Sequence, residues 1–180
     1  MKRKITILTI AFLSSVLMCA NAFAAATGRC GDSITWTLYD SGNLTLSGSG
    51  EMWNYGYDSS PFKDYEIRKA TIEDGITSIG KYAFYGCSGL TELTLSNSLT
   101  SIEDSAFSDC SGLANITSLA EIPPVCGSGV FDGVNKTNCE LIVPIVSVVA
   151  YKEARGWKEF SNIRGFAGRR KVKILTNKRY

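Results

Sequence analysis

One stretch of this 180-residue chain occurs twice, and this repetition constrains the fold more than any other feature of the sequence. The runs from Ile67 to Leu90 and from Leu90 to Leu113 have the same length and share Leu90. Each copy contains Thr-Ser-Ile, then Ala-Phe, then Cys-Ser-Gly-Leu, at the same spacing. A fixed period in the twenties is typical of a solenoid, whose repeats bury their apolar faces against one another. The sequence therefore predicts a stack of coils.

The same period predicts which side chains face the interior. Equivalent positions of a solenoid lie above one another, so a column of apolar residues at this spacing is expected to point inward. The columns continue past the two clean copies, as far as Val148. They consist of Ile67, Leu90 and Leu113; of Ala70, Leu93, Ile116 and Cys139; of Ile72, Leu95, Ser118 and Leu141; of Ile76, Leu99, Ile122 and Ile145; and of Ile79, Ile102, Val125 and Val148.

Each repeat contains a predicted strand, for example within the run from Leu90 to Leu95. This run has the Leu-x-x-Leu-x-Leu pattern of the strand in leucine-rich repeats. Alternate side chains of a strand point to opposite faces, so the polar residues between the apolar ones are expected to lie outward. The Ala-Phe pairs fit a short helical or irregular segment whose ring fills the coil. We predict that the outward face binds the ligand through Thr71, Glu73, Thr94, Ser96 and Thr117.

Residues 25–66 are predicted to form an N-terminal cap and a connector. Ile34–Leu38 and Leu44–Leu46 alternate apolar and polar residues around a turn-rich tetrad, which predicts a β-hairpin with one apolar face. An isolated hairpin is only marginally stable in water, so we expect it to pack on the first repeat. We interpret the connector's aromatic rings as pinning an irregular loop over the first coil; a patch for sugars or a protein is the alternative. These rings belong to Trp53, Tyr55, Tyr57 and Phe62.

After the second clean copy the pattern loosens, which predicts a capping unit at residues 139–163. Pro123-Pro124 excludes a regular helix, and Val130-Phe131 comes one residue late relative to the Ala-Phe pairs, which indicates a bulged or enlarged loop. Within the capping unit, Cys139–Pro144 keeps the strand and Ser147 is placed to cap a short helix. The open end of the stack is expected to be closed by Trp157, Phe160 and Ile163.

The segment 1–24 is predicted to be a secretory signal peptide. A basic run, Lys2 to Lys4, precedes the apolar run Ile5–Met18, and Ala22-Phe23-Ala24 fits a cleavage site. We therefore expect a secreted or surface-exposed bacterial protein that is cleaved near Ala24. Lipidation at Cys19 is disfavoured, because a bulky residue precedes it. The apolar run is too short for a membrane span, so no transmembrane segment is expected in the mature chain.

The charge balance argues against nucleic acid as the main partner. Three of the 19 basic residues lie in the predicted signal peptide, which leaves 16 basic against 17 acidic residues in the mature chain. Neutralising phosphates requires a basic face, and the body of this chain is acidic. Its basic residues concentrate in a tail at residues 164–180. We expect this tail to be a disordered, solvated end rather than an anchor to anionic polymer or lipid.

The run Ile76–Thr91, Ile-Thr-Ser-Ile-Gly-Lys-Tyr-Ala-Phe-Tyr-Gly-Cys-Ser-Gly-Leu-Thr, resembles the BspA-type leucine-rich repeat family of bacterial secreted and cell-surface proteins. The hairpin after Cys30-Gly31 and the closing segment to Ile163 also resemble that family's end pieces. The resemblance implies extracellular binding, often adhesion to host proteins or other cells. It supplies no catalytic residues.

The chain contains no histidine, which removes Ser-His-Asp and Cys-His catalysis and His-dependent zinc sites. Nucleotide-binding and zinc-binding motifs do not occur either, so no cofactor or metal is expected. Glycosidases need only two carboxylates, so a carbohydrate-active enzyme or a glycan-binding accessory module is the alternative function. We interpret the carboxylates that could serve such an enzyme as solvated turn residues, and we predict no enzymatic activity. These acids are Glu73, Asp74, Glu103 and Asp104.

Five of the six cysteines lie outside the predicted signal peptide. Cys87 and Cys110 occupy one repeat column and are expected to be buried. Cys126 and Cys139 lie near the irregular loop, where an oxidising compartment would allow them to form a disulfide. The sequence favours neither this disulfide nor two free thiols over the other.

Together these features predict a short leucine-rich repeat solenoid, β-rich with short helical segments. It has an N-terminal hairpin cap and a C-terminal helical cap around repeats at residues 67–138. The predicted function is binding of an extracellular or cell-surface protein, with a host matrix protein as one candidate. A glycan is the second class of ligand.

Overall fold

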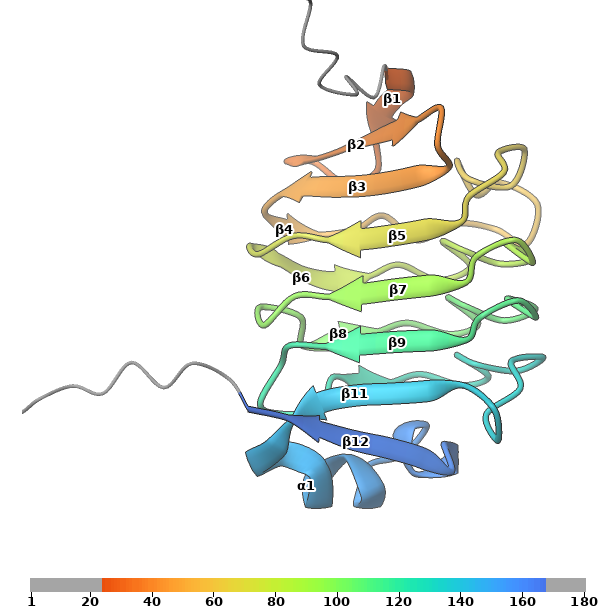
Figure 1. Ribbon diagram of the computed structural model, residues 1–180. Helices are drawn as coiled ribbons and strands as arrows, with labels where there is room; N and C mark the ends of the chain where they lie inside the picture. The colour runs from red at the N-terminus through yellow and green to blue at the C-terminus, as the bar shows by residue number, and fades with distance from the viewer. Residues whose placement is uncertain (1–23, 168–180) are drawn as a thin grey trace, which may run out of the picture.

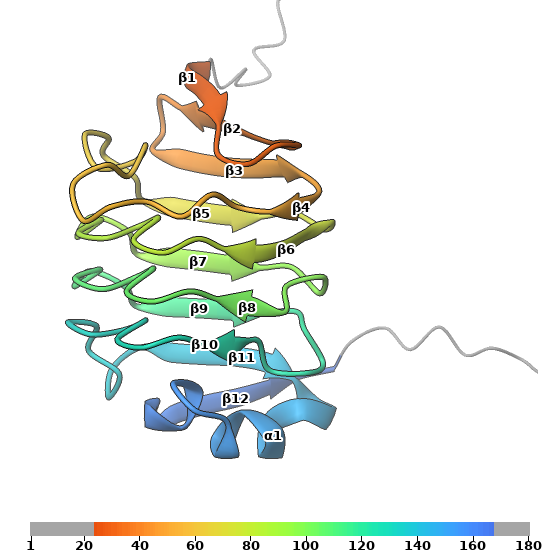
Figure 2. The same ribbon diagram turned by 180° about the vertical axis from the view of Figure 1, so that it is seen from behind.

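The protein is a β-solenoid whose chain winds between an eight-stranded sheet and a four-stranded sheet behind it (Figures 1 and 2). The computed structural model describes residues 24–167; the predicted signal peptide before Ala24, with Cys19, and the tail from residue 168 lie outside them. The larger sheet contains, in spatial order, β1 (Ala24–Arg29), β2 (Ile34–Tyr39), β3 (Asn43–Gly48), β5 (Lys69–Ile72), β7 (Glu92–Leu95), β9 (Asn115–Ser118), β11 (Glu140–Pro144) and β12 (Asn162–Phe166). The smaller sheet contains β10 (Val125–Cys126), β8 (Ser101–Ile102), β6 (Ile76–Ile79) and β4 (Gly50–Glu51).

The larger sheet begins with an antiparallel cap. β2 and β3 form the predicted hairpin, with Trp36 opposite Leu46 and Leu38 opposite Leu44, and these apolar side chains are buried. β3 then pairs in parallel with β5, the first strand of the repeats. β1 adds an antiparallel strand beyond β2. The sequence did not indicate β1, because Ala-Ala-Ala-Thr-Gly-Arg does not alternate large apolar and polar residues.

Three repeats stack at the step that the sequence predicts. Ala70 of β5 pairs with Leu93 of β7, which pairs with Ile116 of β9. All three side chains are buried, and the residues between them point the other way, as alternation along a strand requires. The leucine-rich repeat register is therefore confirmed in these coils.

The register shifts after β9, which overturns part of the predicted columns. Ile102 pairs with Cys126 and not with Val125, the residue that the regular step would place beside it. A shift by one residue moves each side chain to the other face of the strand, so Cys126 is buried while Val125 is 72% exposed. Ile122, 82% exposed, also lies outside the core. The extra residue thus lies in the loop before β10, which is the enlarged loop that the late Val130-Phe131 pair indicated.

A second residue is added before β11, and this returns the strand to its inward register. Ile116 pairs with Leu141, whereas the regular step would pair it with Cys139. Because the two additions together make a shift of two, Leu141 and Cys139 still face the core, where both are buried. Ile145, predicted to continue a core column, is 61% exposed because the chain leaves the sheet there.

Turn segments close each coil on a third side, where phenylalanine rings stack. Ala83-Phe84 and Ala106-Phe107 lie in turns rather than in helices, and their side chains are fully buried. The ring centroids of Phe84 and Phe107 are 5.0 Å apart, and those of Phe107 and Phe131 are 5.9 Å apart. Phe62 of the connector starts the stack, 4.7 Å from Phe84. This ring therefore pins the connector on the first coil, as predicted, whereas Trp53 and Tyr57 of the same prediction are 43% and 65% exposed.

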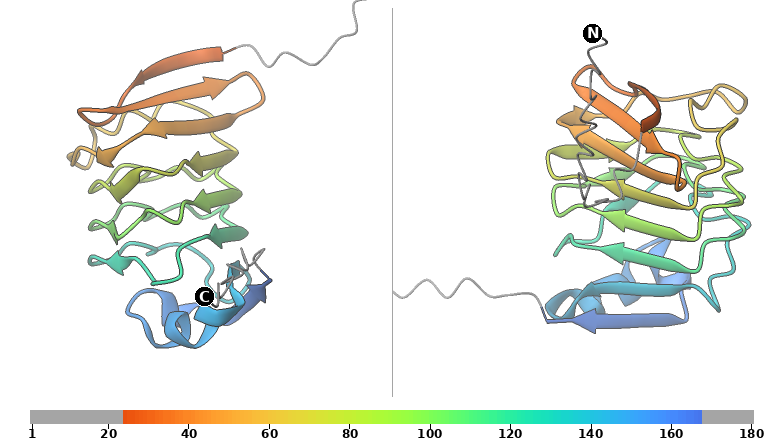
Figure 3. Two further views of the ribbon diagram at one scale, coloured as in Figure 1. Left: turned by 90° about the vertical axis from the view of Figure 1, so that its left-hand side faces the viewer. Right: turned by 45° about the horizontal axis from the view of Figure 1, so that its top comes forward.

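A helical cap closes the C-terminal end of the stack (Figure 3). It consists of the 3-10 helix η1 (Ile145–Ser147), α1 (Val148–Glu153) and the 3-10 helix η2 (Trp157–Glu159). Trp157 and Phe160 are buried, with ring centroids 5.1 and 5.2 Å from that of Phe131. Ser147 precedes α1 as predicted but makes no capping hydrogen bond; its hydroxyl donates to the Glu121 carbonyl instead.

The final strand extends past the predicted end of the cap at residue 163. β12 pairs in parallel with β11 and ends at Phe166. Arg164, predicted to begin the basic tail, lies in this strand with its guanidinium 2.6 Å from the Glu140 carboxylate. No helix within residues 24–167 is long and apolar enough to cross a membrane.

Candidate binding face

A row of threonines crosses the outer face of the eight-stranded sheet. Cross-strand pairing places one threonine in register on each of six neighbouring strands, from β1 to β9. Neighbouring strands are about 4.7–4.9 Å apart, so the row is regular. No helix or loop of residues 24–167 crosses in front of this face in Figure 1. The row consists of Thr27, Thr37, Thr45, Thr71, Thr94 and Thr117.

The predicted binding residues differ in how far they reach solvent. Thr71 and Glu73 are exposed, and Thr94 and Thr117 are partly exposed. Ser96 is only 1% exposed, so it offers far less of its side chain to solvent than the other four. Its short side chain follows β7 and lies among longer neighbours, and its hydroxyl finds no hydrogen-bond partner in the described chain.

The outer face is hollowed beside the threonine row, where β5 and β7 end. An open depression of about 420 Å³ lies there. Thr117 is in register with Thr94 and therefore lies next to it. The depression brings together four of the five predicted residues, Thr71, Glu73, Thr94 and Ser96, with Ile72, Asp74 and Leu119.

The depression is acidic, although charges on the neighbouring strands are paired. The Lys69 ammonium lies 2.9 Å from the Glu92 carboxylate, across the β5–β7 ladder. The Glu73 carboxylate accepts a hydrogen bond of 2.7 Å from the Ser47 hydroxyl. Within residues 24–167, neither Glu73 nor Asp74 forms an ion pair. The rim of the depression therefore carries two acidic groups that no cation neutralises in this part of the chain.

The four carboxylates considered for glycoside chemistry do not meet. Glu73 and Asp74 lie in the turn between β5 and β6, whereas Glu103 and Asp104 follow β8 of the smaller sheet. Glycosidases hold two carboxyl groups about 5–10 Å apart across one cleft. The amide of Ser128 donates a 2.7 Å hydrogen bond to the Asp104 carboxylate and lowers the pKa of that carboxyl group. This hydrogen bond joins two turns of the solenoid. Residues 24–167 also contain no cluster of three or more metal-binding side chains.

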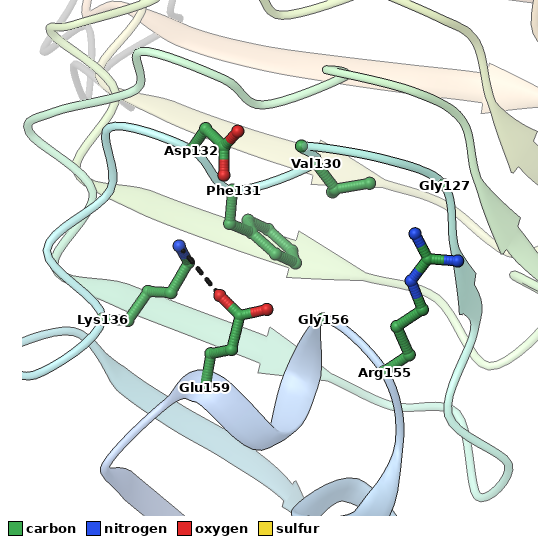
Figure 4. Close-up of a pocket in the computed structure, with 9 residues that line it drawn as sticks. Gly127, Val130, Phe131, Asp132, Lys136, Arg155, Gly156 and Glu159 are labelled. Atoms are coloured by element: carbon green, nitrogen blue, oxygen red, sulfur yellow. Dashed lines mark ion pairs between the residues drawn. The ribbon is translucent and has the colours of Figure 1, made fainter.

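A small polar pocket lies between the last coil and the C-terminal cap (Figure 4). Its walls carry Asp132, Lys136, Arg155 and Glu159, with the Lys136 ammonium 3.1 Å from the Glu159 carboxylate. Ligand pockets usually measure about 300–1,000 Å³. At about 100 Å³, this space is a gap in the packing of the cap rather than a site for a substrate.

An apolar groove that the sequence did not predict lies where the register changes. The loop between β9 and β10 leaves a groove of about 650 Å³ against the preceding turn. Its walls include Leu99, Leu119, Ile122 and Val125. The sequence signal for it is the late Val130-Phe131 pair, which shows that a residue was added but not where.

Residues 57–142 match the family described as "BspA type Leucine rich repeat region (6 copies)". The chain belongs to the BspA-type leucine-rich repeat family. The matched range spans part of the connector, the repeats and the start of β11, so the family predicted from Ile76–Thr91 is confirmed. This BspA-type protein is therefore a repeat module of a kind that mediates protein interaction.

Among solved structures, the BspA-type chain is similar to a leucine-rich repeat protein from Eubacterium ventriosum ATCC 27560, determined at 2.50 Å resolution. The sequence identity is 24% and the TM-score is 0.49. The similarity covers 77% of this chain and 40% of that chain, so this chain spans less than half of that protein's length. None of the curated proteins matches the chain.

The five described cysteines of this BspA-type protein are all buried and free. Cys126 lies in β10 of the smaller sheet, whereas Cys139 immediately precedes β11 of the larger sheet, and both thiols are free in the structure. Burial raises the pKa of the Cys126 thiol to about 12 and that of Cys139 to about 11. Cys87 and Cys110 are buried, as predicted. Because the thiolate is the reactive form, none of these groups is suited to nucleophilic chemistry.

Proposed function

We propose that this protein is a secreted or surface-exposed module that binds an extracellular or cell-surface protein through the outer face of its eight-stranded sheet. The observation that supports this most strongly is the threonine row on an uncovered sheet, next to an acidic depression. The proposal includes the following division of the chain. It comprises a signal peptide at 1–24, a cap and connector at 25–66, repeats at 67–138, a capping unit from residue 139 to the end of β12, and a basic tail after β12.

The threonine row suits a protein ligand for a physical reason. Threonine is β-branched, and its side chain has few accessible rotamers, so it loses little conformational entropy on binding. Each hydroxyl can donate and accept a hydrogen bond, and each methyl group offers apolar contact. A row from Thr45 to Thr117 therefore presents a rigid surface that fits the polar and apolar groups of a folded protein.

The acidic depression indicates which groups the partner presents. Glu73 and Asp74 lie at its rim without a cation in the described chain. A lysine or arginine of the partner would neutralise them, and opposite charges across an interface accelerate association and select the partner. We therefore propose a partner whose contacting surface is basic.

The test uses two matched threonines on opposite sheets. Thr94 of β7 and Thr77 of β6 are both partly exposed strand residues. The mature protein and its Thr94→Arg and Thr77→Arg variants would be passed over immobilised laminin, collagen I and fibrinogen, and affinities measured by surface plasmon resonance. We expect micromolar or tighter binding to at least one of them, with a loss of at least about tenfold in Thr94→Arg only.

A second variant tests the charge on the partner. Glu73→Gln keeps the size of the side chain and its bond to Ser47 but removes the charge. We expect weaker binding than wild type at about 50 mM salt and a smaller difference at about 500 mM, because salt screens exposed charges. Equal loss in Thr94→Arg and Thr77→Arg, or no retention on any of the three proteins, would refute the proposal.

A further inference from the structure

Three exposed tyrosines gather outside both sheets, on the side of the solenoid where the turn segments stack. We call them the tyrosine cluster. Tyr57 lies in the loop between β4 and β5, and Tyr82 and Tyr85 lie in the turn after β6. Figure 1 shows the loop between β4 and β5 at the right of the solenoid. Tyr57 is 65% exposed, and the other two are partly exposed. These rings are not part of the phenylalanine stack, so core packing does not account for them.

The rings of the cluster hold one another in place. The centroids of Tyr57 and Tyr85 are 4.5 Å apart, and each ring also contacts Tyr82 edge to face, at 6.1 and 5.7 Å. The Tyr85 hydroxyl donates a 3.2 Å hydrogen bond to the Tyr57 hydroxyl, and the Asp109 carboxylate lies near the Tyr85 hydroxyl. The cluster is therefore a preorganised surface with aromatic faces, hydroxyls and one carboxylate.

Two residues of this surface occupy backbone positions that suit glycine better. The φ angle is 55° at Tyr82 and 58° at Asp109. Coil-to-coil hydrogen bonds place Tyr82 in one column with Ser105, at 53°, and Gly129, at 64°, and place Asp109 in another column with Gly86 and Gly133, at 71° and 79°. Left-handed backbone at a bulky residue is unfavourable and tends to occur at functional sites. The left-handed backbone recurs at this turn position in each coil, and Tyr82 is the bulkiest residue that occupies it.

The charges around the cluster are nearly balanced. The Lys81 ammonium lies 5.4 Å from the centre of the Tyr82 ring and 3.5 Å from the Asp104 carboxylate. In the connector, Lys63 pairs with Asp58 at 2.9 Å. Asp109 is the acid of the cluster that no ion pair within residues 24–167 neutralises. An anionic ligand is thus disfavoured, and a neutral ligand that donates hydrogen bonds is favoured.

From these observations we infer that the tyrosine cluster binds a neutral glycan. The C–H face of a pyranose ring packs on an aromatic ring, and Tyr57 offers the most exposed ring. The sugar hydroxyls then donate to Asp109 and exchange hydrogen bonds with the phenol groups. This site is separate from the protein-binding face proposed above, so each can be tested without the other.

The test is titration calorimetry of the full mature chain with three probes. Two are neutral, the hexamers of β-1,4-linked glucose and of β-1,4-linked N-acetylglucosamine; the third is a heparin hexasaccharide. We expect a Kd on the order of 1 mM or tighter for at least one neutral hexamer and weaker or no binding of the anionic one. We expect Tyr57→Ala to weaken the neutral hexamer about tenfold and Tyr57→Phe, which keeps the ring, to weaken it only about twofold.

Tyr65→Ala is the matched control. Tyr65 is 41% exposed in the same connector but packs edge to face on Trp36, outside the cluster. We expect it to bind the neutral hexamers like wild type. Absence of binding of both neutral hexamers at about 10 mM would overturn the inference, as would binding that is unchanged in Tyr57→Ala. Equal melting temperatures of the variants would show that loss of binding is not loss of folding.

Discussion

At the scale of single residues, Asp104 links neighbouring turns of the solenoid. Its carbonyl accepts the amide of Tyr82 on one side, and its carboxylate accepts the amide of Ser128 on the other. The Ser128 bond is the main reason that the pKa of the carboxyl lies below its usual 3.8, and Lys81 at 3.5 Å adds to the effect. Folding thus favours the ionised form of this group.

Replacing Asp104 with Asn should make the protein less stable in a pH-dependent way. Because its pKa is lowered by folding, the charge contributes stability above pH 3.8, and the contribution disappears as the pH falls below that value. We expect a lower Tm for Asp104→Asn than for wild type at pH 7, and a smaller difference at pH 3. Asp64→Asn, in an exposed connector residue, is the control and should change Tm little. A Tm difference that grows on acidification would contradict this interpretation.

The cysteines should react only after unfolding. Burial raises the pKa of Cys30, Cys87 and Cys126 to about 12, so the thiolate is scarce at neutral pH and shielded from solvent. We expect no rapid labelling of the folded mature protein by a maleimide at pH 7.5. In denaturant, all five thiols should react, with or without prior reduction. Two fewer labelled sites in the unreduced sample would reveal a disulfide instead.

At the scale of elements, the cap helix α1 accounts for a polar residue in an apolar column. Ser118 stands where Ile72 and Leu95 stand in earlier repeats, yet it is fully buried. Its hydroxyl lies 2.7 Å from the hydroxyl of Tyr151 on α1, which donates in turn to the Ala120 carbonyl at 3.0 Å. The serine therefore joins the last regular repeat to the cap.

A double-mutant cycle should show this coupling. Tyr151→Phe leaves the Ser118 hydroxyl and the Ala120 carbonyl without a partner, which we expect to cost about 1–3 kcal/mol of unfolding free energy. In the Ser118→Ala background the same change should cost less, by about 0.5–1 kcal/mol, because one orphaned group is gone. Urea unfolding of the four proteins measures the difference. Strictly additive effects would mean that the two side chains act independently.

Sequence periodicity predicted the regular coils well but not the places where the period changes. The columns of Ala70 and Ile72 follow from alternation and a fixed step, which local sequence specifies. Two extra residues shift β10 and β11, and nothing local in the sequence shows where they lie. The burial of Ser96 was not predicted for a similar reason, because it depends on the side chains beside it. The tyrosine cluster arises from contacts between the connector and a turn, which no single segment reveals.

At the scale of the whole molecule, one continuous core runs between two caps. Solenoid repeats contact only their neighbours, so the ends need covering. Here the antiparallel strands β1 to β3 cover one end, and α1, η2 and β12 cover the other. The phenylalanine stack runs between them, from Phe62 to Phe131 and the cap's Trp157. This rigid body presents its uncovered sheet on one face and its tyrosine cluster on another.

Thiol protection tests most directly whether the uncovered sheet face contacts a protein partner. Cysteines would be introduced singly by Thr94→Cys and Thr77→Cys; the native thiols are buried, so the new thiol reacts first. The maleimide labelling rate would be measured with and without the matrix protein that the chain retains. We expect the partner to slow labelling at position 94 by about tenfold or more and to leave position 77 unchanged. Equal labelling rates at position 94 with and without the bound partner would contradict binding through this face of the sheet.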